Sequence, residues 1–199
     1  MNTVSHNRGR KLPPEPLSKS EVLTLMATCS QHSPIGLRDR ALIAVLWRGQ
    51  LRISEALALK PADFDADFCA LWVLHGKGDR TRVAVVDRGT VDVLQSWMDA
   101  RRELGVSERQ PIFCTLKGGE IDPGQIREML PRRARKAGIT KRCNPHNFRH
   151  SGASELASAG VPILMIKEQL GHANIGTTDR YIHALNPKAR IDLLKAREW

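Results

Sequence analysis

Apolar residues recur every three or four positions along most of the chain, and this spacing predicts amphipathic or buried helices. The pattern changes near the middle of the chain, where short runs rich in β-branched residues predict strands instead. The predicted helices begin after Ser18 and then cover residues 37–48, 53–59, 90–104, 123–137, 146–159, 162–170, 175–183 and 187–197. We therefore expect a mainly helical protein.

Capping residues support several of these helix ends. Ser18 and Glu21 form the Ser-x-x-Glu pattern of a capping box. Asp122-Pro123 provides an N-cap residue followed by a proline in the first helical position. Glycines at positions 138, 160 and 171 follow three predicted helix ends. Pro131 lies inside one predicted helix, and we expect it to kink or split that helix.

Two β-rich runs, residues 69–74 and 81–86, are joined by a glycine-rich segment, residues 75–80. This arrangement predicts an antiparallel hairpin. Ile112-Phe113 and the Gly118-Gly119 turn predict one more small hairpin. The expected fold class is therefore α+β, mainly helical with a small antiparallel β-sheet.

The length of 199 residues fits a single domain. Residues 1–16 are polar and basic and contain three prolines, so we expect them to form a flexible arm. We assign residues 17–199 to the folded domain, with the predicted helix 187–197 at its C-terminal end.

The formal net charge of +10 favours a polyanionic partner, most simply nucleic acid. The positive charge is concentrated in residues 126–149, where a single acidic residue, Glu128, accompanies the basic ones. These are Arg127, Arg132, Arg133, Arg135, Lys136, Lys141, Arg142 and Arg149. Such a block is either a solvated helix face or a phosphate-binding surface.

The four cysteines are far apart in sequence and form no Cys-x-x-Cys pair, which argues against zinc-ribbon and thioredoxin-like sites. We expect reduced, mostly buried thiols in a cytoplasmic protein. No apolar run approaches the roughly 20 residues that a membrane span requires. The polar N-terminal segment also lacks the apolar core of a signal peptide, so we expect no membrane partner.

A constellation of polar residues in the C-terminal half provides candidate chemistry. His146-Asn147-Phe148-Arg149-His150 is followed by Leu170-Gly171-His172 and then by the only tyrosine of the chain. Upstream, one arginine lies in Leu51-Arg52-Ile53-Ser54-Glu55, and one lysine lies in Gly76-Lys77-Gly78. The candidate catalytic residues are Arg52, Lys77, His146, Arg149, His172 and Tyr181.

These residue types meet the demands of phosphodiester cleavage. Arg52 and Arg149 offer planar forks of permanently charged donors for the non-bridging oxygens of a phosphate. Tyr181 is a possible nucleophile if nearby cations stabilise its phenolate. His146 titrates near neutral pH and suits proton transfer.

Simpler interpretations remain for each residue. Arg52 can form an ion pair with Glu55, three residues along the same helix face, and this contact is compatible with a role in binding phosphate. Arg80 and Arg82 lie near Lys77 in the sequence and could take its place as the cation of the site. Tyr181 could be an ordinary half-buried tyrosine. The spacing His146-x-x-x-His150 permits a zinc site, but Asn147 follows His146 where a zinc-binding helix has glutamate, and no third ligand is nearby.

Taken in order, the six residues resemble the pattern of the tyrosine recombinases, the lambda-integrase and Xer-like family of DNA strand-exchange enzymes. That pattern is an arginine, a lysine in a β-turn, His-x-x-Arg, a second histidine and a tyrosine. The resemblance extends from about Leu17 to the C-terminus. Leu170-Gly171-His172, with its histidine nine residues before Tyr181, contributes most to it.

The resemblance implies a metal-independent transesterification on double-stranded DNA. Tyr181 would form a 3′-phosphotyrosyl link, Lys77 would protonate the departing 5′-oxygen, and His150 would be a structural neighbour of the site. No cofactor is implied, and a tetramer on DNA in the cytoplasm, associated with the nucleoid, is expected. Two alternatives share the residue pattern in whole or in part: a type IB topoisomerase and a non-catalytic DNA-binding regulator.

The family usually carries an additional N-terminal helical domain, whereas at most 16 residues precede the first predicted helix here. The chain is then either an excised catalytic domain or a naturally short member. Family members also use a C-terminal segment to dock on a neighbouring protomer. The predicted helix 187–197 could do the same or pack on its own domain.

Overall fold

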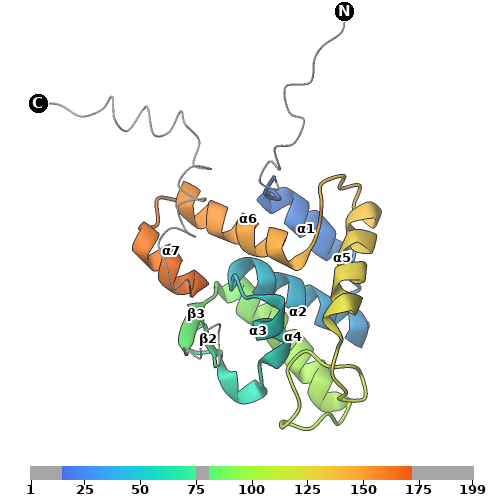
Figure 1. The fold of residues 1–199 in the computed structure, drawn as a ribbon. Helices are drawn as coiled ribbons and strands as arrows, with labels where there is room; N and C mark the ends of the chain where they lie inside the picture. The colour runs from blue at the N-terminus through green and yellow to red at the C-terminus, as the bar shows by residue number, and fades with distance from the viewer. Residues whose placement is uncertain (1–14, 75–80, 172–199) are drawn as a thin grey trace, which may run out of the picture.

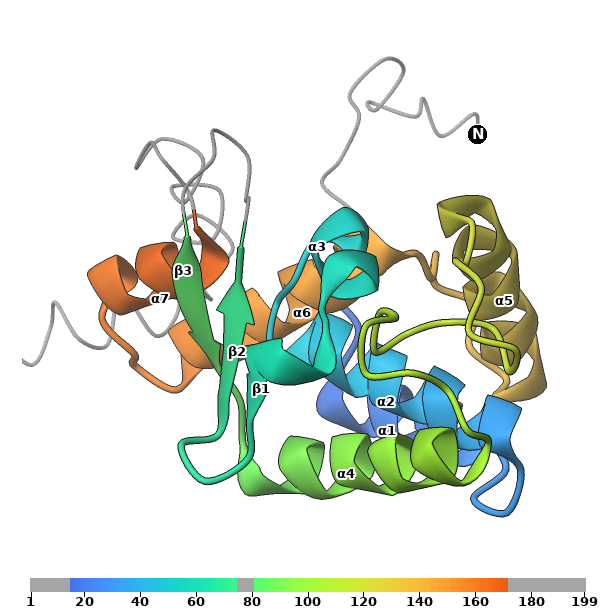
Figure 2. The same cartoon turned by 90° about the horizontal axis from the view of Figure 1, so that it is seen from below.

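The computed structural model describes residues 15–74 and 81–171, which form a mainly helical body with a small sheet at one side (Figures 1 and 2). Its helices are α1 (Lys19–Ala27), α2 (Pro34–Arg48), α3 (Ile53–Ala58), the 3-10 helix η1 (Pro61–Asp63), α4 (Arg88–Glu103), α5 (Pro123–Lys136), α6 (Pro145–Ser158) and α7 (Ile163–Leu170). Its strands are β1 (Phe64–Asp65), β2 (Ala70–Val73) and β3 (Arg82–Val85).

Helix α2 is the centre of the hydrophobic core. It begins after the N-cap residue Ser33, whose side chain accepts a hydrogen bond from the backbone of Gly36. Leu42, Val45 and Leu46 are completely buried because α4 packs against one side of α2 and α6 against another. Figure 2 shows α4 running along the bottom of the body, beneath α2. This packing fixes α6, which carries the His-x-x-Arg motif, against the core.

The sheet is antiparallel in the order β1-β2-β3. Trp72 of β2 pairs with Val83 of β3, so the predicted hairpin is confirmed. The free edge of β3 faces α7, where the side-chain amide of Gln169 accepts from the backbone nitrogen of Val85 and donates to its carbonyl. The side-chain amide of Gln169 thus makes the hydrogen bonds that a neighbouring strand would make to Val85, and it holds α7 beside the sheet.

The predicted helix ends agree with the structure to within a few residues, and the capping patterns explain the agreement. The reciprocal hydrogen bonds of the Ser18–Glu21 capping box are both present, and Asp122 caps α5. Gly171 ends α7 in the left-handed conformation, with φ of 60°. This conformation favours glycine because it has no Cβ atom.

Two expectations need correction, and one strand was not expected. Helix α5 is one helix that includes Pro131, so the expected split is wrong. Proline removes one N–H donor from the helix, but the buried side chains of Met129, Leu130 and Ala134 hold both turns against the core. The hairpin expected at residues 112–119 is reduced to one β-bridge, between Cys114 and Glu120. Strand β1 was not predicted, because two residues are too few to show a periodic pattern.

All four cysteines are free, and Cys29, Cys114 and Cys143 are buried, as expected. Within residues 15–74 and 81–171, no helix is long and apolar enough to cross a bilayer. The predicted arm, apart from its last two residues, and the predicted helices 175–183 and 187–197 lie outside the described residues.

Candidate active site

A buried carboxylate, Glu55, is the centre of the candidate site. Its side chain is only 5% exposed. Arg52, from the same short segment, contacts it at 2.6 Å, Arg82 of β3 at 2.9 Å, and Arg149 of α6 lies 3.8 Å away. The fold therefore brings three cations from distant parts of the sequence to one anion, which leaves the cluster with a net positive charge.

Arg52 is the N-cap residue of α3, and its position is fixed by two contacts with Glu55. Its backbone nitrogen donates to Glu55 Oε2 at 2.7 Å, and its Nη1 donates to Oε1 at 2.6 Å. The expected ion pair with Glu55 is thus confirmed. The Arg52 side chain is 29% exposed, more than either of the other two arginines. Because the guanidinium is held at one nitrogen and remains accessible to solvent, it is suited to bind an incoming anion.

Arg149 is almost completely buried on α6 and makes contacts that span the site. Its Nη1 donates to the carbonyl of Gln50, just before Arg52 in the chain. Its Nη2 donates to the carbonyl of Leu170 at 2.5 Å, in the last turn of α7. Arg149 thus connects the segment that carries Arg52 to the end of α7, immediately before His172.

Glu55 remains ionised although it is buried. Burial alone raises the pKa of its carboxyl group, but three effects outweigh it: the hydrogen bond from Arg82, the hydrogen bonds from the backbone and side chain of Arg52, and the positive charge of Arg82. The net result lowers the pKa from 4.5 to about 2. The carboxylate therefore acts as a permanent counter-ion that orients the guanidinium groups.

This low pKa predicts a loss of stability in acid. A carboxyl group with a folded-state pKa below its unfolded value stabilises the fold above the unfolded pKa, and that contribution disappears as pH falls from 4.5 towards 2. The expected loss is on the order of 3 kcal/mol. Urea unfolding at a series of pH values should show this loss for the wild type, and Glu55→Gln should lack it. Parallel pH profiles for the two proteins would contradict the assignment.

His146 and His150 lie one turn apart on α6 but in different environments. His146 is exposed, whereas His150 is 8% exposed. Burial, and then the charge of His146, lower the pKa of His150 below 6.5. His146 is thus the more accessible of the two histidines. Arg149, three residues after His146, is buried.

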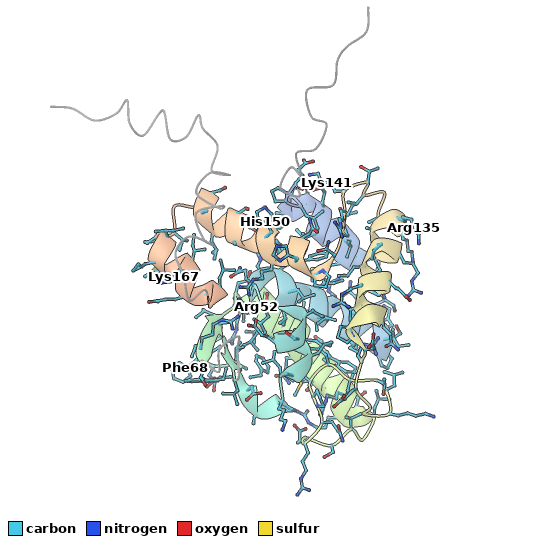
Figure 3. All side chains as sticks on the ribbon, in the orientation of Figure 1. Arg52, Phe68, Arg135, Lys141, His150 and Lys167 are labelled. Carbon is cyan, nitrogen blue, oxygen red and sulfur yellow. The ribbon has the colours of Figure 1, made fainter. Side chains whose placement is uncertain are left out.

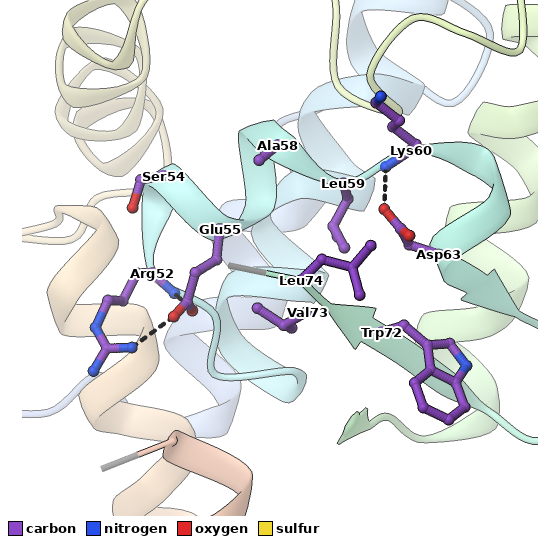
Figure 4. Close-up of a pocket in the computed structure, with 10 residues that line it drawn as sticks. All are labelled: Arg52, Ser54, Glu55, Ala58, Leu59, Lys60, Asp63, Trp72, Val73 and Leu74. Atoms are coloured by element: carbon purple, nitrogen blue, oxygen red, sulfur yellow. Dashed lines mark hydrogen bonds and ion pairs between the residues drawn. The ribbon is translucent and has the colours of Figure 1, made fainter. Parts of the chain in front are cut away.

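An open pocket of about 560 Å³ lies next to this cluster (Figure 4). Arg52 and Glu55 form one end of it, and Trp72 forms the other. Val73 and Leu74 line its wall where β2 ends. The chain enters segment 75–80 after Leu74 and leaves it one residue before Arg82, which contacts Glu55. Both ends of the segment that contains Lys77 are therefore at this site.

The structure describes three of the six candidate catalytic residues. Arg52 and Arg149 meet at Glu55, and His146 precedes Arg149 by one helical turn. Lys77, His172 and Tyr181 lie outside the described residues. Arg82 was not predicted from the sequence as part of the cluster. It was considered only as a nearby cation that could take the role of Lys77. Its partner Glu55 is remote in sequence, so no local spacing could have revealed the pair.

The basic block 126–149 divides into two groups with different surroundings. Arg133 donates to buried Asp39, Lys141 contacts Glu15 and Glu21, and Arg149 belongs to the cluster at Glu55. The exposed members are Arg127, Arg132, Arg135, Lys136 and Arg142. Figure 3 shows Arg135 on α5 at the outer edge of the body, pointing away from it. Outside the cluster at Glu55, only the exposed group of this block is available for contacts with a polyanion.

A metal site is a separate question, because His146 and His150 have the spacing of zinc ligands. In the part of the chain that the structure describes, no group of three or more histidine, cysteine, aspartate or glutamate side chains could hold a metal ion.

Comparison with known protein families gives a match along most of the chain. Residues 15–187 match the model of the phage integrase family. Tyrosine recombinase XerC of Myxococcus xanthus is 34% identical over 179 residues, which cover 86% of this chain and 59% of XerC. Tyrosine recombinase XerD of Mycobacterium leprae is 35% identical over 183 residues, which cover 87% of this chain and 57% of XerD. The chain thus spans somewhat more than half the length of these curated relatives.

Solved structures give the same result. The crystal structure of XerA recombinase superimposes with a TM-score of 0.80 at 27% identity and covers 98% of this chain and 68% of XerA. The XerH site-specific recombinase, bound to palindromic difH substrate in a post-cleavage complex, gives a TM-score of 0.75 at 26% identity. That match covers 95% of this chain and 55% of XerH. The expected fold class is confirmed.

Proposed function

Since this chain belongs to the phage integrase family of tyrosine recombinases, we propose that it is a site-specific DNA recombinase that cuts and rejoins double-stranded DNA through a 3′-phosphotyrosyl intermediate. The observation that carries this proposal is the convergence of Arg52 and Arg149 on Glu55. Arg52 is bonded to Glu55 at one end of an open pocket, and Arg149 lies 3.8 Å from the same carboxylate. The two guanidinium groups therefore form a preorganised site for a phosphate.

The proposed reaction consists of two successive transesterification steps. In the first, the phenolic oxygen of Tyr181 attacks the scissile phosphorus, the bond to the 5′-oxygen breaks, and a 3′-phosphotyrosyl bond forms. In the second, a 5′-hydroxyl attacks the same phosphorus and releases the tyrosine. Since one phosphoester bond replaces another in each step, no nucleotide is consumed.

Each side chain of the proposed site has a distinct role. Arg52 and Arg149 stabilise the negative charge that develops on the non-bridging oxygens, His146 transfers the proton of Tyr181, and His172 donates a hydrogen bond to a phosphate oxygen. Lys77 protonates the departing 5′-oxygen. Leu74 in the pocket wall and Arg82 in contact with Glu55 flank the segment that contains Lys77, and their positions support its role. The position of Leu170, whose carbonyl Arg149 binds, supports the role of His172.

A nicked suicide duplex provides the test. Cleavage next to the nick releases a short fragment that diffuses away, so the covalent protein–DNA adduct accumulates. Duplexes carrying sequences that flank the coding region should give an adduct, which a non-catalytic regulator would not form. A second assay with two recombination sites separates the recombinase from a type IB topoisomerase, since only a recombinase exchanges strands between sites.

DNA binding should weaken as salt concentration rises. Each phosphate contact contributes about 0.9 to the slope of log K against log salt. Replacing the exposed Arg132 and Arg135 by glutamine together should therefore lower the slope by about 2. Fluorescence anisotropy with a labelled duplex measures this slope. The control Arg102→Gln, at an exposed residue of α4 outside the block, should leave the slope unchanged. Equal slopes for both variants would show that Arg132 and Arg135 do not contact DNA.

The remaining parts of the proposal concern assembly and location. We assign residues 17–199 to the catalytic domain, which acts as a tetramer on DNA in the cytoplasm, in association with the nucleoid. The docking of helix 187–197 on a neighbouring protomer would couple the tyrosine of one protomer to the state of the next. These statements rest on the family resemblance and on the net charge of +10.

A further inference from the structure

Arg82 is the third cation at Glu55, and its surroundings differ from those of Arg52 and Arg149. It is the first residue of β3, and its side chain is 11% exposed. Nη1 and Nη2 donate to the two carboxylate oxygens of Glu55 at 3.1 and 2.9 Å, and Nε donates to the carbonyl of Gln169 at 3.2 Å. All three nitrogens of the guanidinium are thus directed into the protein.

The fork of Arg82 matches the carboxylate of Glu55 in geometry as well as in charge. A bidentate arginine–carboxylate pair is stronger and more directional than a single contact. The guanidinium of Arg52, in contrast, contacts the same carboxylate through Nη1 alone. Because Arg82 occupies both oxygens of Glu55, it fixes the plane of the carboxylate to which Arg52 must orient.

The end of α7 is attached to the same cluster. Arg82 binds the carbonyl of Gln169, and Arg149 binds the carbonyl of the next residue, Leu170. These carbonyls carry the partial negative charge of the helix C-terminus, which cations stabilise. A Cβ atom on Gly171 would lie 2.6 Å from Cδ of Arg82. The side chain of Arg82 therefore packs directly against Gly171, the last residue before His172.

We propose that Arg82 is a positioning residue of the strand-transfer site, which orients Arg52 and Arg149 through Glu55 and fixes the end of α7 without contacting the DNA itself. Without Arg82, the buried carboxylate would draw the two phosphate-binding arginines towards itself. The carbonyl of Gln169 would also lose its donor. This role rests on the proposed function, because it concerns the geometry of the same site.

The test compares Arg82→Gln with Arg133→Gln. Arg133 is a matched control, since it also donates to a buried carboxylate, that of Asp39, and to one carbonyl, that of Thr28. It lies in α5 and makes no contact with Glu55 among the described residues. Single-turnover adduct formation on the nicked suicide duplex, DNA affinity and thermal unfolding are measured for each protein.

For Arg82→Gln we expect adduct formation to slow by about 100-fold while DNA affinity changes by less than about 3-fold. Arg82→Lys retains the charge without the fork and should restore part of the rate. Arg133→Gln should lose stability but react at the wild-type rate once folded. Equal rates for folded Arg82→Gln and the wild type would overturn the positioning role.

A double variant shows whether Arg82 acts through the charge of Glu55. In a Glu55→Gln background no buried anion competes for the arginines, so adding Arg82→Gln should slow the reaction by less than about 3-fold. A further loss as large as in the wild-type background would overturn the proposal that Arg82 acts through Glu55. This pair also provides the test if Arg82→Gln alone does not fold. Failure of the wild type to form an adduct would instead reject the proposed function, and the role of Arg82 with it.

Discussion

Tyr181→Phe is expected to abolish the covalent protein–DNA adduct and to leave DNA affinity almost unchanged. The substitution removes one oxygen atom, which is required only for bond formation. Tyr181 is the only tyrosine of the chain, so the variant has no other phenol that could replace it. The expected fall in adduct formation is at least about 10⁴-fold, to the background of the assay.

Denaturing gel electrophoresis on the nicked suicide duplex measures the adduct, and anisotropy measures affinity under the same conditions. The wild type, at equal occupancy of the DNA, is the control. An adduct that persists in Tyr181→Phe would identify a different nucleophile. A large loss of affinity would instead indicate that the hydroxyl group contributes to DNA binding rather than to bond formation alone.

Arg149→Ala has the second largest expected effect, and it acts on both folding and chemistry. The substitution leaves the carbonyls of Gln50 and Leu170 without their donor and removes one of three cations near buried Glu55. We expect a loss of about 2–3 kcal/mol in the free energy of unfolding. Adduct formation should fall by about 10³-fold because a donor to the phosphate oxygens is also lost.

Arg149→Lys separates the two effects, because it retains the charge but not the fork. We expect it to recover part of the stability and yet to react about 100-fold more slowly than the wild type. Arg101→Lys is the matched control. Arg101 is also buried, and it donates to the carbonyls of Val106, Ser107 and Gln110 on the far side of the core. Arg101→Lys should lose stability and keep the wild-type rate of adduct formation. A loss of rate equal to that of Arg149→Lys would contradict the catalytic assignment of Arg149.

The helices could be predicted because their determinants are local. Apolar periodicity and the caps at Ser18, Asp122 and Gly171 specify where each helix begins or ends, and no distant residue is needed. Pro131 shows the limit of this reasoning. Its cost is also local, but burial of the neighbouring Leu130 against the core outweighs it. Strand β1 was missed because only its pairing with β2 defines it.

Only part of the candidate site could be predicted from the sequence. The Arg52–Glu55 pair follows from a spacing of three residues at the start of a helix, and the structure contains it. The contact between Arg82 and Glu55 joins a residue of β3 to a residue of α3, and no sequence spacing reveals it. The carbonyl partners of Arg149 likewise come from segments that only the tertiary fold brings together. Candidate site residues could therefore be identified from the sequence, whereas the orientation of their side chains relative to one another could not.

The most direct test of the central claim is to identify the residue that becomes linked to DNA. The wild-type protein is incubated in EDTA with the nicked suicide duplex, and the trapped adduct is digested with protease and nuclease and analysed by mass spectrometry. Our account predicts that the modified peptide carries a 3′-phosphonucleotide on Tyr181 and that it forms at the same rate with and without EDTA. A link to another residue, or a strict requirement for a divalent metal ion, would contradict it.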